Sequence, residues 1–122
     1  MLFRSNDQLA AIPTAPDCNA GLISHADLQG NAQDGLKVDR ASLNTFINIT
    51  SQTNGNNGAT LTQYSRYNNF FGGDLEGNTT YQLSVESGAT ENKIIGTGCS
   101  GTVSDAGTRT IIIGSRSITS AR

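Results

Sequence analysis

The sequence predicts an all-β fold, a single-domain antiparallel β-sandwich or jelly roll of about six to eight short strands. The main observation is the segment 79–87, where apolar and polar residues alternate as in a strand with one buried face. Composition is the second, because 14 glycines with abundant Thr and Asn favour strands joined by tight turns. The third is the turn sequence Asn54-Gly55-Asn56-Asn57-Gly58, which readily supplies positive φ angles.

An extended N-terminal arm is expected over residues 1–18, followed by the β-sandwich domain over residues 19–122. Pro13 and Pro16 would interrupt any helical turn begun in the arm. Residues 1–5 have two interpretations, a native start or the non-native translation of a sequencing-library adapter. The arm is the predicted contact between subunits.

Strands are expected wherever apolar residues alternate between turn-forming residues. In chain order they lie at 22–23, 36–39, 43–50, 59–66, 79–87, 93–95 and 108–118. The Asn-Gly turn would join 43–52 and 59–66 in a hairpin. The last strand is apolar on both faces around Ile111 to Ile113, which predicts that both faces are covered. No internal repeat is evident.

Cys18 and Cys99 are the two cysteines, and they lie far apart in the chain. A disulfide between them would close a long loop and stabilise the fold by roughly 4 kcal/mol in the chain-entropy model. Such a bond requires an oxidising compartment, which the low charge and the Thr- and Asn-rich composition favour. Two unrelated buried thiols are the alternative.

No credible catalytic or metal-binding set is found, so we expect a non-enzymatic protein without a cofactor. His25 is the single histidine, and no nucleophile elbow accompanies it. Asp74 and Glu76 are interpreted as a solvated turn rather than a calcium loop. Two cysteines and one histidine fall short of the about four ligands of a structural zinc site.

Four aromatic residues gather in the segment 64–71: Tyr64, Tyr67, Phe70 and Phe71. The simpler interpretation is that their rings seal one end of the core. The alternative is a ligand platform for sugars, because aromatic faces beside Asn and Asp side chains suit the C–H surfaces and hydroxyls of carbohydrates. The sequence leaves both interpretations open.

The net charge is −2 and the basic residues are scattered, which argues against nucleic acid as a partner. No apolar run approaches the roughly 18 residues of a membrane span. We therefore expect a structural or assembly subunit of an extracellular filament, a surface layer or a virion or capsid, which forms a homo-oligomer or polymer. The alternative is a carbohydrate-binding or adhesion module, with glycans as partners and the aromatic segment 64–71 as its site.

Overall fold

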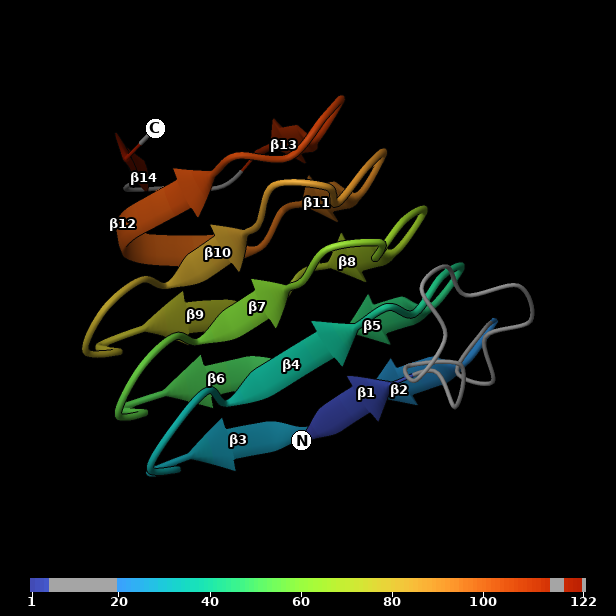
Figure 1. Ribbon diagram of the computed structural model, residues 1–122. Coiled ribbons are helices and arrows are strands. Elements are labelled where there is room, and N and C mark those ends of the chain that lie inside the picture. The colour runs from blue at the N-terminus through green and yellow to red at the C-terminus, as the bar shows by residue number, and fades with distance from the viewer. Residues whose placement is uncertain (5–19, 115–117, 122) are drawn as a thin grey trace.

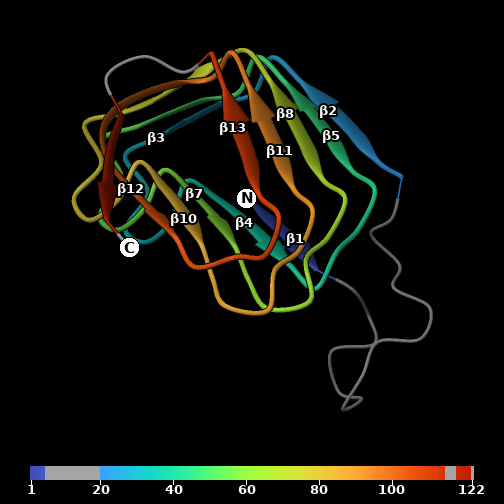
Figure 2. The same ribbon diagram turned by 90° about the horizontal axis from the view of Figure 1, so that it is seen from above.

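The computed structural model describes residues 1–4, 20–114 and 118–121, and over them the chain winds into a parallel β-solenoid of about four turns. We call each turn of the solenoid a coil. Each full coil contributes one strand to a five-stranded sheet and then two segments to a nine-stranded sheet. Figure 1 shows the coils stacked side by side, and Figure 2 shows the sheets enclosing a central core.

The five-stranded sheet is built from the first strand of each coil. It contains β2 (Leu22–Ser24), β5 (Thr45–Ile47), β8 (Asn69–Phe71), β11 (Lys93–Ile95) and β13 (Ile111–Ile113). The nine-stranded sheet contains β1 (Leu2–Arg4), β3 (Asp27–Gln29), β4 (Leu36–Asp39), β6 (Thr50–Gln52), β7 (Ala59–Leu61), β9 (Asp74–Glu76), β10 (Leu83–Val85), β12 (Gly98–Asp105) and β14 (Ile118–Ala121). The long strand β12 joins its two arms, because it pairs with β9 at its start and with β10 and β14 further along.

The predicted antiparallel sandwich or jelly roll is wrong, because the paired strands run parallel to one another. The predicted hairpin between 43–52 and 59–66 is wrong for the same reason. Residues 45–52 form two strands, β5 and β6, while β7 pairs with β4 and β10. The Asn-Gly segment is instead a corner between β6 and β7. Alternation over a few residues reports a half-buried strand, but it carries no information on the direction of the neighbouring strand.

A repeat of 23 to 24 residues relates the coils, so the expectation of no internal repeat is also wrong. Thr45 lies beside Asn69 and Asn69 beside Lys93 in the five-stranded sheet. Outward-facing positions such as these differ in residue type from coil to coil. The repeat is therefore carried by a few inward-facing and corner positions, which makes it hard to detect in one sequence.

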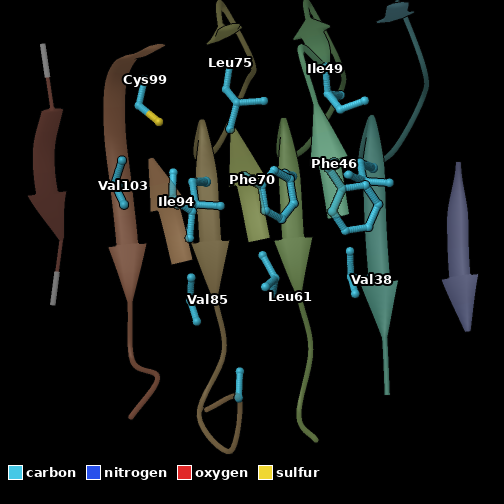
Figure 3. Close-up of a cluster of buried hydrophobic side chains, with 14 of the residues drawn as sticks. Val38, Phe46, Ile49, Leu61, Phe70, Leu75, Val85, Ile94, Cys99 and Val103 are labelled. Carbon is cyan, nitrogen blue, oxygen red and sulfur yellow. The ribbon is translucent and has the colours of Figure 1, made fainter. Parts of the chain in front are cut away.

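The core is a set of columns in which each side chain lies on its equivalent in the next coil (Figure 3). One column runs through Phe46, Phe70 and Ile94, and the two rings stack with centroids 4.7 Å apart at 29°. Leu75 and Cys99 belong to a second column, and Val38, Leu61 and Val85 form a third. Burial of each large side chain contributes about 1.5–3 kcal/mol.

The central strand prediction is confirmed in part. Leu83 and Val85 are buried in β10 as expected, but Gln82, expected in solvent, is also buried. The prediction for the last apolar run is wrong, because Ile111 and Ile113 of β13 are 40% and 57% exposed. Of the predicted arm, residues 2–4 form β1, whereas residues 6–18 lie outside the described residues.

Candidate functional site

One corner of the solenoid keeps large side chains where glycine would be expected. At the corner that leads into the five-stranded sheet, Leu43, Tyr67, Glu91 and Arg109 have φ angles of 62°, 56°, 54° and 54°. We call these four residues the corner column. The left-handed conformation costs an L-residue roughly 1–2 kcal/mol, so glycine is preferred there. Each of the other corner columns among the described residues contains glycine, whereas this one, including Ala20 in the first coil, contains none.

A buried asparagine ladder fixes this corner. Asn44, Asn68 and Asn92 each follow a residue of the corner column, and all three are 0% exposed. The Nδ2 of Asn44 donates to Oδ1 of Asn68 at 3.1 Å, and the Nδ2 of Asn68 donates to Oδ1 of Asn92 at 3.0 Å. The backbone N–H groups of Asn44 and Asn68 donate to the same oxygens. The amide ladder thereby ties three successive coils together at the base of the corner column.

A second ladder crosses the nine-stranded side of the solenoid. Asn31 donates through Nδ2 to Oδ1 of Asn54 at 2.9 Å, and Asn54 donates likewise to Asn78 at 2.8 Å. Asn78 continues the chain of bonds to Oε1 of Gln82 at 2.9 Å. This network explains why Gln82 is buried, since its side chain satisfies the last amide of the ladder.

Beside the corner column lies an open groove of about 330 Å³. It is lined by Tyr67, Glu91, Lys93, Arg109 and Ile111, which come from three successive coils. Arg109 forms an ion pair with Glu91, and the two side chains are 70% and 29% exposed. An exposed pair of this kind adds little stability, so its interest lies in the donors that it presents to solvent. We call this feature the corner groove.

An outward-facing polar row continues from the groove across the five-stranded sheet. Thr45, Asn69 and Lys93 occupy equivalent positions in β5, β8 and β11. Neighbouring strands are about 4.8 Å apart, so the row offers one hydroxyl, amide or ammonium group at each such step. Among the described residues, Lys93 forms no ion pair, and Asn69 makes no side-chain hydrogen bond.

The structure divides the four aromatic residues of the predicted platform. Tyr67, 46% exposed, lines the corner groove, and Tyr64, 37% exposed, lies at a different corner. Phe71 is 38% exposed on the outer face of β8, but Phe70 is 1% exposed and stacks on Phe46 in the core. Phe70 therefore cannot offer its ring to a ligand, and the other three do not share one surface site.

Four residues of the corner groove were not singled out from the sequence, namely Glu91, Lys93, Arg109 and Ile111. The only signal that could have found them is the repeat, which places Tyr67, Glu91 and Arg109 in successive coils.

The remaining chemical candidates do not assemble a reactive site. His25 is exposed at a corner, and its Nε2 lies 3.4 Å from Nδ2 of Asn48. Glu76 accepts a hydrogen bond from Gln52 at 2.8 Å, with Asp74 two residues away in β9. Over the described ranges, no three His, Cys, Asp or Glu residues lie close enough to hold a metal ion.

The predicted disulfide can be followed only on one side. Cys99 is 0% exposed in β12 and lies beside Leu75 in the core. Cys18 lies outside the described residues, so pairing of the two cysteines stays a prediction.

No protein-family model, curated protein or solved structure matches this chain. Within the part of the chain that the structure describes, no helix has the length and apolar character to cross a membrane.

Proposed function

We propose that this chain is a non-enzymatic structural or assembly subunit, exposed outside the cell in a filament or surface layer, or on a virion. The observation that supports this proposal most strongly is the coil-to-coil bonding. Successive coils are joined by parallel backbone pairing, by stacked core side chains and by two amide ladders. A solenoid joined in this way resists bending at any one coil, which suits a building block that carries load or spacing.

The outer face of the five-stranded sheet supports contact with a second copy of the chain. Ile47, Phe71, Ile95 and Ile113 occupy equivalent outward positions in successive strands. We call them the apolar row. Phe71 and Ile113 are 38% and 57% exposed, and the other two are partly exposed. A continuous apolar row on a regular sheet face can pack against the same face of another subunit, which buries both.

Light scattering coupled to size-exclusion chromatography tests the assembly proposal. We expect the purified chain to form dimers or larger species that dissociate on dilution. Phe71→Ser should weaken association, whereas Tyr64→Ser, which removes an equally exposed aromatic side chain at another corner, should not. A strictly monomeric wild-type chain at high concentration would contradict the proposal.

Carbohydrate binding at the corner groove is the second candidate function. It is favoured by the corner column, where side chains are retained in a conformation that favours glycine, since such local strain is common at binding sites. An exposed tyrosine ring beside hydrogen-bonding groups is also a common sugar-binding arrangement. A glycan array tests it: Tyr67→Ala should abolish binding and Tyr64→Ala should preserve it. An unchanged profile for Tyr67→Ala would remove the groove as the site.

A further inference from the structure

We infer that the corner groove is selective for acidic saccharides, with the sugar ring on Tyr67 and its carboxylate held by Lys93 and Arg109. This inference rests on the second candidate function, carbohydrate binding, and adds the chemical class of the ligand. Three features of the groove carry it: its charge, its geometry and its rigidity.

The groove carries an excess of positive charge although the whole chain has a net charge of −2. Its charged residues are Glu91, Lys93 and Arg109, and Glu91 is already paired with Arg109. Lys93 is exposed and has no ion-pair partner within the described part of the chain. Arg109 is 70% exposed, so its guanidinium has further N–H donors for a second anion. A carboxylate between these two cations would balance the groove's charge.

The geometry favours a saccharide over an acidic peptide. Peptides commonly bind sheets by adding a strand to an unpaired edge. At the groove, β8 and β11 are already paired on both sides, so their backbones offer no such edge. The outward row of Thr45, Asn69 and Lys93 instead presents one polar side chain per strand. A sugar chain lying along the solenoid axis would meet a hydrogen-bonding group at each step of about 4.8 Å.

The site is rigid before the ligand binds. The residue after Tyr67 is Asn68, and the residue after Glu91 is Asn92, both buried in the asparagine ladder. Their amide bonds fix the backbone from which the two groove side chains project. A preformed site loses less conformational entropy on binding, which favours a weakly held, solvated ligand such as a sugar.

Titration calorimetry on the full chain tests the inference with matched ligands. The probes are an oligogalacturonate, its neutral carboxyl-reduced counterpart and an oligoglutamate peptide of similar length. We expect the acidic saccharide to bind at least about tenfold more tightly than the neutral one, in line with one charge-assisted hydrogen bond. Lys93→Gln should remove most of this preference. Lys37→Gln, on β4 of the other sheet, should leave it intact.

Each outcome bears on a different claim. Equal binding of the acidic and neutral saccharides would overturn the acidic selectivity but leave carbohydrate binding standing. Binding of the peptide alone, or of none of the three probes, would overturn the inference. An unchanged preference in Lys93→Gln with a wild-type circular dichroism spectrum would also overturn it. Light scattering on the same samples reports assembly separately, so failure of the sugar site is not confused with failure of the structural role.

Discussion

Removal of one rung of the asparagine ladder should destabilise the solenoid far more than its exposed surface suggests. Asn68→Ala eliminates four buried side-chain hydrogen bonds: two donated by Asn44 to Oδ1, and two donated by Nδ2 to Ala41 and Asn92. At about 1 kcal/mol for each hydrogen bond, the loss is about 4 kcal/mol. That is a large fraction of the total stability of a domain of this size.

A matched variant isolates the effect of burial from that of residue type. Asn31→Ala also replaces a ladder asparagine, but Asn31 is exposed and its side chain donates one bond, to Asn54 at 2.9 Å. Its expected cost is below about 1 kcal/mol. Free energies of unfolding for wild type and both variants can be obtained from guanidinium titrations followed by far-ultraviolet circular dichroism.

The comparison has a clear refuting result. If Asn68→Ala is no more destabilising than Asn31→Ala, the amide ladder does not hold the coils together and stacking of the core side chains suffices. Since solenoids can unfold coil by coil, coincident transitions by circular dichroism and tyrosine fluorescence should accompany each measurement.

Three further predictions concern corners and core, each measured as a change in the free energy of unfolding. Thr53→Gly should stabilise by about 1 kcal/mol, because Thr53 has a φ of 52° and its described coil equivalents are glycine; a loss of stability would contradict the strain argument. Gly73→Ala should cost more than about 3 kcal/mol, since its Cβ would lie 2.3 Å from a backbone oxygen, whereas Gly30→Ala, with open space around it, should cost about 1 kcal/mol; equal costs would refute this. Phe70→Ala should cost about 4 kcal/mol and Phe71→Ala under about 1 kcal/mol, because only Phe70 is buried; the reverse order would invalidate the described register.

The corner groove shows why a binding surface on a solenoid escapes sequence reasoning. Tyr67 was singled out because it lies among other aromatic residues, yet its groove neighbours Glu91 and Arg109 are distant in the chain. They meet because one coil is about as long as their separation. The aromatic cluster was misleading for the opposite reason: Phe70 and Phe71 are adjacent in sequence but point to opposite faces of β8.

The sequence by itself determined the local conformation of this protein. The alternation around Leu83 and Val85 and the glycine- and asparagine-rich turns were sufficient to predict an all-β chain, because these signals act over a few residues. Only the tertiary structure decided that the strands run parallel, that the Asn-Gly segment is a corner, and that Asn44, Asn68 and Asn92 form one ladder. Strand direction and coil length depend on hydrogen bonds between residues some 23 to 24 positions apart, and alternation within a strand is the same in either direction.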